Sequence, residues 1–478
     1  VKLFRELETP WNVDASYAAI LGTKPKAELG ISLYRGADPL VLDLDGDGID
    51  LVGQSSVSPR FDLDGDGFSE KTGWVGSGDG LLALDRNGNG VIDDVSELFG
   101  GPRADGGVDT NGDGRITGAE RMQSGFDALA AYDGNGDGVI DASDAVFSEL
   151  RVWIDADGDA VTDEGELKTL AEVGITSISL AATDESGVFV AGNQVTATGG
   201  FTRADGSTST IANVDLKIDN FDSQWLAATT LSETAAALPE LRGHGTLADL
   251  RQVMTLAPSL ETVVAGALDD LGAARGMEAI RSAAIPVLLG WAASQPAVAS
   301  TENYQTVHVV LGASDRHVVD YAYAVQVDGI ERWMLASSNT SYESLAALKA
   351  ANPSLDGRWR DLSGDELAFV ERYTGEQLPT VLDAGSSKSA VVAAFDMAYS
   401  HLDMLSVRLA VQAAPDYYGL SYDVSEDLFR PATDRQLVPF FEQVFSEVQT
   451  ATPAEVSAYF ATMSDVFDRI VTAYDRGT

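Results

Sequence analysis

The chain has 478 residues and a mass of 50.4 kDa, and its 45% hydrophobic and 22% charged residues are typical of a folded globular protein with several domains. Acidic residues outnumber basic ones 74 to 31, and the resulting net charge of −43 argues against binding to nucleic acids or anionic membranes. No cysteine is present, which excludes disulfides and thiolate metal sites, and the longest apolar stretch, residues 283–293, is too short to span a bilayer. Because the chain begins at Val1 without a visible signal peptide, we expect a fragment or a processed product.

The predicted organisation starts with an upstream segment, residues 1–37, and continues with an acidic segment, residues 38–220. From Asp38 to Glu166 the chain has 30 acidic and 7 basic residues, which gives a net charge of −23 in 129 residues. Carboxylates at this density resist compaction unless a cation neutralises them, and Ca²⁺ prefers such oxygen ligands. We therefore expect a calcium-binding module with Ca²⁺ as its cofactor.

Three stretches of the acidic segment fit the 12-residue EF-hand loop, which has oxygen ligands at positions 1, 3, 5, 7 and 12 and glycine at position 6. The third of them departs from this pattern in having Ala160 at the glycine position. The alternative interpretation is a set of acidic turns that bind no metal. The predicted ligands, including three backbone carbonyls, are Asp109, Asn111, Asp113, Arg115 and Glu120; Asp133, Asn135, Asp137, Val139 and Asp144; and Asp155, Asp157, Asp159, Val161 and Glu166.

Three further stretches contain only the front half of the loop. Position 12 is Gln54 in the first and Gly73 in the second, and in the third the acid comes one place late, at Glu97. A half-loop can still bind calcium when a distant acid completes the coordination shell. The predicted ligands are Asp43, Asp45 and Asp47; Asp62, Asp64, Asp66 and Glu70; and Asp85, Asn87, Asn89, Asp93 and Glu97.

The spacing of the three full loops leaves room for only one short helix between neighbours, because their first residues are 24 and 22 positions apart. The apolar pattern of residues 119–132 predicts that helix. Ile116 and Ile140 occupy the apolar position 8, which pairs neighbouring loops. We therefore expect a compact variant of the EF-hand, closer to the dockerin repeat.

Beyond the loops, the pattern changes to short strands and then to helices. A hairpin is predicted at Ala204-Asp205-Gly206, and helices broken at Pro239, Pro258 and Pro286 are predicted over residues 221–300. Residues 301–478 are predicted to be a mainly helical domain with a β hairpin. The predicted strands are 175–180, 188–190, 195–203 and 207–216; the second hairpin is 325–330, with 331–337 as an alternative helix start; and the terminal helices are 389–413 and 452–470.

The predicted fold class is thus α+β: compact EF-hand-like calcium loops with a small antiparallel β region, then a mainly α-helical C-terminal part. The prediction rests on the period of the apolar residues, the spacing of the acidic loops and the turn residues between strands.

Several stretches of the acidic segment follow one another in an order that allows comparison with a known family. They are Asp38-Pro39-Leu-Val-Leu-Asp43, residues 61–68, residues 71–75, residues 84–100 and, at the far end, residues 167–170 and 200–206. Together they resemble the self-processing module of RTX-type secreted bacterial proteins over about residues 38 to 217. Weaker likeness, through residues 238–247 and 366–371, is to the helical region that often follows this module. The nonapeptide repeats that name the RTX class are absent from the sequence.

The resemblance implies that calcium folds the module and that the folded module cleaves the Asp38-Pro39 bond at its own N-terminal edge. A single Asp-Pro pair means little by itself, so its place just before the first acidic loop carries the inference. The Asp38 carboxyl can attack its own backbone carbonyl and form a five-membered anhydride. Water can then open the anhydride, or a lysine of this chain or of another protein can form an Asp-Lys isopeptide bond.

The resemblance further implies a large exported bacterial protein, secreted or held at the cell surface. The alternative function is a non-catalytic, calcium-stiffened structural or adhesion module, with dockerin-like binding of a cell-surface partner. The sequence shows no HExxH pair and no GxSxG elbow, so we expect no separate hydrolase site.

Overall fold

The structure is a computed structural model, and its described residues fall into two compact units that meet in the chain at Ala227 and Ala228. Predictions for residues 1–37, for the loop from Asp109 to Glu120, for Asp64 and for the helix at 452–470 lie outside the described residues. The described residues are 38–55, 57–63, 65–100, 124–295, 304–312, 317–327, 330–375, 378, 388–418, 420–423 and 428–431.

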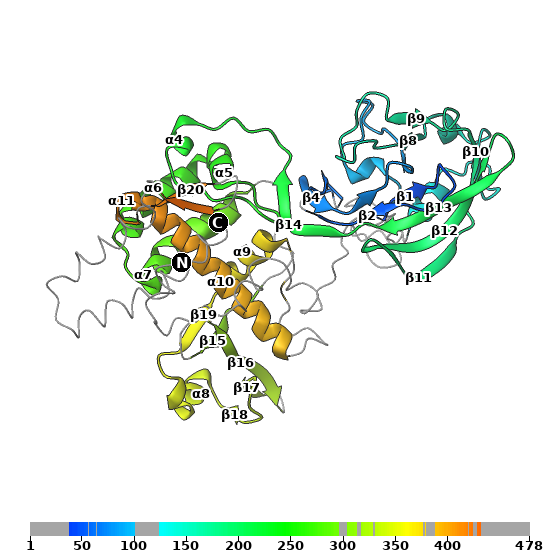
Figure 1. The fold of residues 1–478 in the computed structure, drawn as a ribbon. Helices are drawn as coiled ribbons and strands as arrows, with labels where there is room; N and C mark the ends of the chain where they lie inside the picture. The colour runs from blue at the N-terminus through cyan, green and yellow to red at the C-terminus, as the bar shows by residue number, and fades with distance from the viewer. Residues whose placement is uncertain are drawn as a thin grey trace, which may run out of the picture. The chain divides into compact units, whose positions relative to one another are not determined.

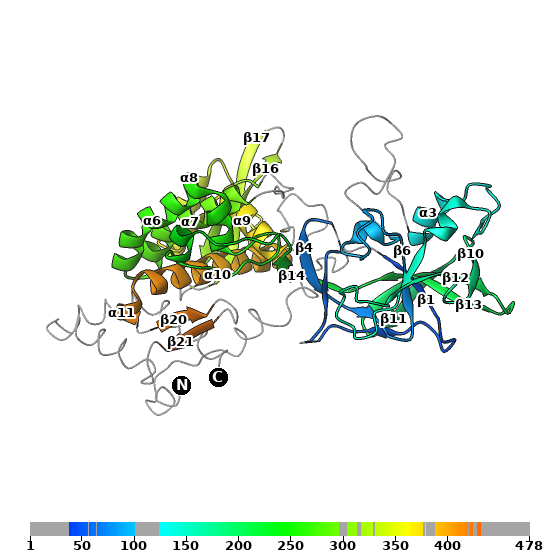
Figure 2. The same ribbon diagram turned by 90° about the horizontal axis from the view of Figure 1, so that it is seen from above.

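The first unit is built on a nine-stranded antiparallel sheet, which is curled (Figures 1 and 2). The hydrogen-bonded order is β7-β10-β12-β13-β1-β6-β8-β9, and β11 pairs with β12. Strand β1 is therefore central, between β13 and β6. The strands are β1 (Leu40–Leu42), β6 (Gly80–Ala83), β7 (Val139–Asp141), β8 (Arg151–Trp153), β9 (Leu167–Thr169), β10 (Ile175–Ser179), β11 (Thr183–Val190), β12 (Asn193–Arg203) and β13 (Thr208–Asp215).

Strand β1 is buried on both faces of this sheet. Leu40 belongs to one core cluster, together with side chains of helix α3 (Gly125–Ala130). Val41 belongs to the other cluster, which contains the indole rings of Trp74 and Trp153 with centroids 5.6 Å apart. A strand buried on both faces is a short continuous apolar run without alternation, so periodicity does not distinguish it from a helix segment.

Two smaller sheets complete the first unit. One has the order β14-β4-β3, and the other pairs β2 with β5. Both are antiparallel, and β14 ends the unit. Their strands are β2 (Leu51–Val52), β3 (Arg60–Phe61), β4 (Phe68–Thr72), β5 (Trp74–Val75) and β14 (Ile218–Trp225).

The second unit combines helices with a five-stranded antiparallel sheet of order β18-β17-β16-β15-β19. The long helix α10 packs against α6, α7 and α9. No helix among the described residues is long and apolar enough to cross a membrane. The elements are α4 (Glu233–Ala236), α5 (Leu250–Leu256), α6 (Pro258–Ala273), α7 (Met277–Ser294), β15 (Val307–Leu311), β16 (Val318–Val327), β17 (Ile330–Leu335), β18 (Ser341–Tyr342), α8 (Leu345–Ala351), β19 (Trp359–Leu362), α9 (Gly364–Thr374), α10 (Lys388–Ala413), α11 (Pro415–Tyr418), β20 (Leu420–Asp423) and β21 (Leu428–Pro431).

Several predicted elements are confirmed. The hairpin at 204–206 joins β12 to β13, and the hairpin at 325–330 joins β16 to β17, where Val327 pairs with Ile330. Helix α10 spans the predicted 389–413, and Pro258 separates α5 from α6. These elements have strong local signals, either turn residues between strands or a long apolar period.

The predicted fold class is wrong in both halves. The β region of the first unit is not small, because the nine-stranded sheet is its framework, and the described acidic loops lie next to strands of that sheet or of the three-stranded sheet. The second unit is not mainly helical, since it contains the five-stranded sheet. Strands β1, β6 and β8 have only three or four residues between Asp- and Gly-rich loops, so no alternation is long enough to indicate a sheet.

Smaller corrections have similar causes. Pro286 does not break a helix but lies inside α7, where packing of Ile280 and Trp291 in the core outweighs the lost hydrogen bond. Residues 221–225 belong to strand β14, and the alternative helix start at 331–337 is instead strand β17. Ile140 lies in β7 opposite Ile178 of β10, while its predicted loop partner, Ile116, lies outside the described residues.

Candidate functional site

The acidic loops share one turn, which is fixed by the first aspartate of each loop. In the loop that starts at Asp85, Oδ1 accepts from the backbone N–H of Gly88 at 2.7 Å and Oδ2 accepts from Gly90 at 2.9 Å. This is the turn that the sequence motif predicts. The loops that start at Asp62, Asp133 and Asp155 have the same two bonds, and Asp43 accepts from Gly46.

Position 6 of the loops requires a backbone conformation that favours glycine. Gly90 has a φ of 88° and Gly138 a φ of 82°, both in the left-handed region. In the third full loop this place is taken by Ala160, with a φ of 60°. The alanine therefore adopts the turn at a steric cost, but it does not abolish it.

A second acid closes each of the two described full loops by accepting two backbone N–H bonds. In the Asp133 loop, Asp144 accepts from Gly134 at 2.9 Å and from Asp141 at 3.1 Å. These donors are the second and ninth residues of the loop. The Asp155 loop repeats the arrangement: its closing acid, Glu166, accepts from Ala156 at 2.8 Å and from Asp163 at 3.0 Å.

Two of the half-loops are closed by the acids that the sequence suggested. Glu97 comes one residue after position 12 of its loop. It nevertheless accepts from Arg86 at 3.0 Å and from Asp93 at 3.1 Å, as a closing acid at position 12 does in the other loops. Burial raises the pKa of its carboxyl. In the Asp62 loop, Glu70 accepts from the backbone N–H of Leu63 at 3.4 Å.

The loop that starts at Asp43 is closed by an acid that sequence reasoning missed, Asp79. Its carboxylate accepts from Leu44 at 3.2 Å and from Asp50 at 2.7 Å. The register of β1 and β6 explains why Asp43 and Asp79 lie close together. Leu42 is opposite Gly80 in this antiparallel pair, so Asp43, which follows Leu42, is next to Asp79, which precedes Gly80. An isolated acid next to a short apolar run was the only sequence signal.

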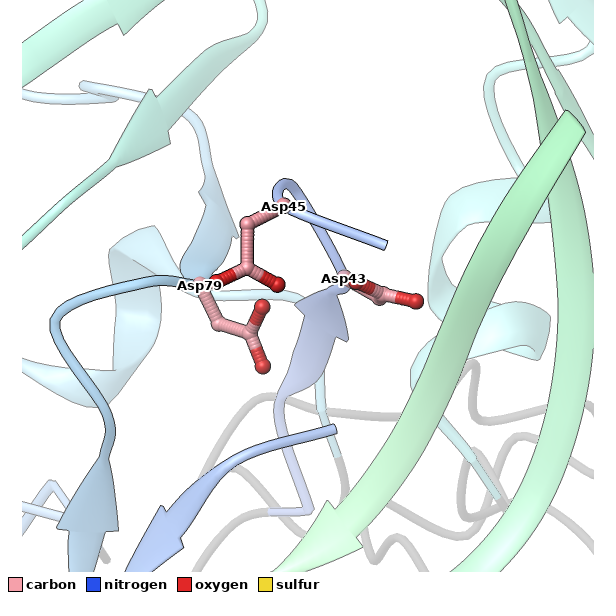
Figure 3. A group of neighbouring side chains, drawn as sticks. All are labelled: Asp43, Asp45 and Asp79. Carbon is pink, nitrogen blue, oxygen red and sulfur yellow. The ribbon is translucent and has the colours of Figure 1, made fainter. Parts of the chain in front are cut away.

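Asp43, Asp45 and Asp79 form a compact group in which one carboxylate oxygen of each lies within 4.8 Å of the others (Figure 3). Asp79 is almost completely buried, and its burial raises its pKa to about 6, with a further increase from the charges of Asp43 and Asp45. Arg203 donates to the backbone carbonyls of Asp43 and Leu44, which holds the start of this loop against β12.

A second group of three carboxylates is formed by Asp155, Asp157 and Asp159, again within 4.8 Å. Two tryptophans from the core hold this loop: Trp74 Nε1 donates to Asp155 at 2.6 Å and Trp153 Nε1 donates to the closing acid at 3.4 Å. The indole rings therefore join the hydrophobic core directly to the candidate metal ligands.

The other predicted ligands are less closely gathered. Among the described residues, no third cluster of three carboxylates forms, and the Asp85 and Asp133 loops have asparagine at their third position. Asp47 and Asp66 lie in the turns of their own loops. Of the residues predicted to bind metal through the backbone carbonyl, Val139 begins β7 and Val161 is exposed. The structure thus brings together ligands most completely in the Asp43 and Asp155 loops.

The Asp38-Pro39 bond lies immediately before β1 and is buried. The backbone N–H of Val214 donates to the Pro39 carbonyl at 3.0 Å, and the Asp38 carboxylate accepts from the side-chain amide of Asn213. Gly100 lies against the same peptide bond, since a Cβ there would be 2.8 Å from the Asp38 carbonyl carbon and 3.0 Å from the Pro39 nitrogen. Sequence reasoning missed Asn213, whose only signal is a polar residue within an apolar strand.

Comparisons with known proteins follow this division of the chain. Residues 40–217 match the SPM domain family. The chain is also 32% identical over 359 residues to the iron-regulated protein FrpA of Neisseria meningitidis serogroup C. The alignment covers 73% of this chain but only 28% of that relative. The matched range of the SPM domain contains every described acidic loop and begins one residue after Pro39.

Proposed function

We propose that residues 38–217 form a calcium-binding, self-processing module of a large exported RTX-type bacterial protein, and that calcium triggers cleavage of its Asp38-Pro39 bond. The observation that carries the proposal is that this bond lies directly before the central strand, β1. Asp38-Pro39 immediately precedes the three residues of β1, and the first acidic loop immediately follows them at Asp43. The match to the SPM domain over nearly the same residues supports the assignment.

Calcium is the cation that the loops favour. Ca²⁺ takes six to eight oxygen ligands at about 2.3–2.6 Å, which carboxylates and backbone carbonyls supply. The Asp43 and Asp155 loops each combine three adjacent carboxylates with a turn of the calcium-loop type. Without a cation these like charges repel one another, so binding energy becomes folding energy for the sheet that the loops connect.

The cleavage needs no nucleophile from elsewhere in the chain. Asp38 Oδ1 bonds to the Asp38 carbonyl carbon, the bond from that carbon to the Pro39 nitrogen breaks, and the nitrogen takes up the proton that the carboxyl group gives up. The product is a cyclic anhydride and a new N-terminus at Pro39. Water then adds across the anhydride and restores two carboxyl groups, or a lysine amine adds and forms an amide.

Calcium acts on this chemistry through position. The anhydride forms only when the carboxylate oxygen is held close to the carbonyl carbon, and well-oriented intramolecular reactions gain many orders of magnitude in rate. In the folded unit, β13 and β6 hold β1 on both sides, and the backbone N–H of Leu40 donates to Phe99 at 3.0 Å. Folding of the loops and fixing of the bond are therefore one event.

Substitutions at the bond test the proposal. Asp38→Asn should abolish calcium-triggered cleavage and leave calcium binding unchanged, and Asp38→Glu should nearly abolish it because a six-membered anhydride misplaces the carboxyl. Pro39→Ala should slow cleavage by making the leaving amine poorer. Denaturing gels and intact masses after calcium addition are the measurements. If Asp38→Asn is cleaved like the unmodified chain, the mechanism is wrong.

The acceptor of the anhydride is a separate part of the proposal. A lysine of this chain or of a cell-surface partner protein would give a crosslinked product that is lighter than the sum of its parts by one water. Mass spectrometry of tryptic peptides identifies such a bond to Asp38. If the chain binds calcium and folds but stays whole, the non-catalytic structural or adhesion module is the better assignment.

A further inference from the structure

The side chain of Asn213 is fixed by three hydrogen bonds in the middle of strand β13, where it is 1% exposed. Its Oδ1 accepts from the backbone N–H of Gly125 at 2.6 Å. Its Nδ2 donates to Thr196 Oγ1 at 2.7 Å and to Asp38 Oδ2. Both amide hydrogens and the oxygen are thus used, so the amide has one orientation.

Four separate segments meet at this amide. Thr196 belongs to β12, Gly125 begins helix α3, and Asp38 precedes β1. Gly125 leaves no room for another residue, because a Cβ there would lie 2.8 Å from Asn213 Oδ1 and 2.6 Å from the Phe99 carbonyl oxygen. Any buried amide must have its hydrogen bonds satisfied, and one of the groups that satisfies Asn213 is the carboxylate of Asp38.

Consecutive residues of strand β13 contact the two residues that flank the candidate bond. Asn213 holds the Asp38 carboxylate, and the backbone N–H of Val214 holds the Pro39 carbonyl at 3.0 Å. Gly100 lies against the peptide bond between them. Strand β13 therefore holds the Asp38 carboxylate on one side of the bond and the Pro39 carbonyl on the other.

We propose that Asn213 is a positioning residue for cleavage of the Asp38-Pro39 bond, an inference that rests on the proposed self-processing. Asn213 Nδ2 donates to Oδ2 of the Asp38 carboxyl group, and in the proposed step Oδ1, which carries the proton of that group, attacks the Asp38 carbonyl carbon. In the anhydride, Oδ1 becomes the ring oxygen and Oδ2 remains an exocyclic carbonyl oxygen. The bond from Asn213 therefore persists from the reactant to the intermediate while the bond to Pro39 breaks and its nitrogen takes up the released proton.

Asn213→Asp is the most direct test, because it has the same shape and keeps the acceptor for Gly125. It replaces the donor facing Asp38 with a second carboxylate oxygen. At neutral pH the two carboxylates repel, and we expect calcium-triggered cleavage to slow by about 10- to 100-fold. At lower pH the two groups can share a proton, so the pH–rate profile should shift to the acidic side.

Asn193→Asp is a matched control in the same sheet. Asn193 is also completely buried, but its amide donates to the backbone carbonyls of Val52 and Val190. The same chemical change there can weaken folding, but it should leave the pH–rate profile unchanged. Calcium titration and circular dichroism in calcium should show that the Asn213→Asp protein still binds and folds.

The outcomes separate this inference from the proposed function. If the unmodified full chain is not cleaved in calcium, the proposed function fails. If it is cleaved, and Asn213→Asp has the same rate and pH profile, the positioning role is overturned. If Asn213→Asp does not fold, Thr196→Val replaces it, because it removes the acceptor that orients Asn213; slower cleavage in the folded protein supports the role, and an unchanged rate contradicts it.

Discussion

The two units of this chain stabilise their acidic side chains in different ways. In the first unit, carboxylates such as Asp79 accept backbone N–H bonds and lie beside other carboxylates. In the second unit, carboxylates face cations: Arg281 Nη2 lies 2.7 Å from Asp403 Oδ1, and Lys388 Nζ lies 3.7 Å from Asp320 Oδ1. These carboxylates of the second unit thus have counter-charges within their own unit, whereas the acidic loops of the first unit gather carboxylates that, in the proposed function, a metal ion neutralises.

The largest expected effect of this difference is on folding. Removing calcium from the full chain should unfold the first unit and leave the second folded, because in the proposed function only the acidic loops of the first unit need an external cation. Far-UV circular dichroism in chelator should retain a helical spectrum, while the fluorescence of Trp74 and Trp153 should change strongly. Identical spectra and fluorescence with and without calcium would contradict the comparison.

A substitution at an ion pair of the second unit should affect that unit alone. Arg281→Ala removes the guanidinium that pairs with the buried carboxylate of Asp403, and breaking such a pair costs about 3–5 kcal/mol. We expect a much lower unfolding temperature for the second unit and an unchanged calcium titration. Differential scanning calorimetry in calcium and isothermal titration measure the two quantities, and a weakened calcium affinity would show that the units are coupled.

A pH effect should also distinguish the second unit. Burial raises the pKa of Glu240 to about 8, although the backbone N–H of Arg251 donates to it. Since this value is above the ordinary 4.5, the folded state binds the extra proton. The contribution of Glu240 to stability is therefore highest below pH 4.5 and falls as pH rises toward about 8, by on the order of 5 kcal/mol.

Glu240→Gln tests this assignment, because a glutamine cannot titrate. The calcium-insensitive unfolding transition of this variant should vary less with pH than that of the unmodified chain. A difference between the two proteins that stays constant from pH 4.5 to about 8 would be the contrary result.

The smallest expected effect concerns a single loop. Asp79→Asn removes one of three adjacent carboxylates, and we expect about a 10-fold loss of affinity at the Asp43 loop, since ligand charge tunes calcium affinity. Asp205→Asn makes the same charge change on the exposed hairpin between β12 and β13 and serves as the control. Isothermal titration that shows equal effects for the two variants would remove Asp79 from the site.

The sequence predicted local features well and long-range ones poorly. The turns of the acidic loops and both hairpins follow from neighbouring residues, so motif and turn chemistry were enough to predict them. Asp79 and Asn213 reach their partners only through the pairing of β1 with β6 and β13, and nothing in the local sequence specifies that pairing. Strands β10 to β13 of the sheet were predicted, but β1, β6, β7, β8 and β9 were missed, because strands of three or four residues have no detectable period.

The most direct test of the account is a calcium titration of the full chain in which folding and intact mass are measured together. The account predicts that cleavage begins over the same calcium range as folding of the first unit, and that it yields one piece ending at Asp38 and another beginning at Pro39. A chain that folds with calcium and keeps its full mass for days would contradict self-processing.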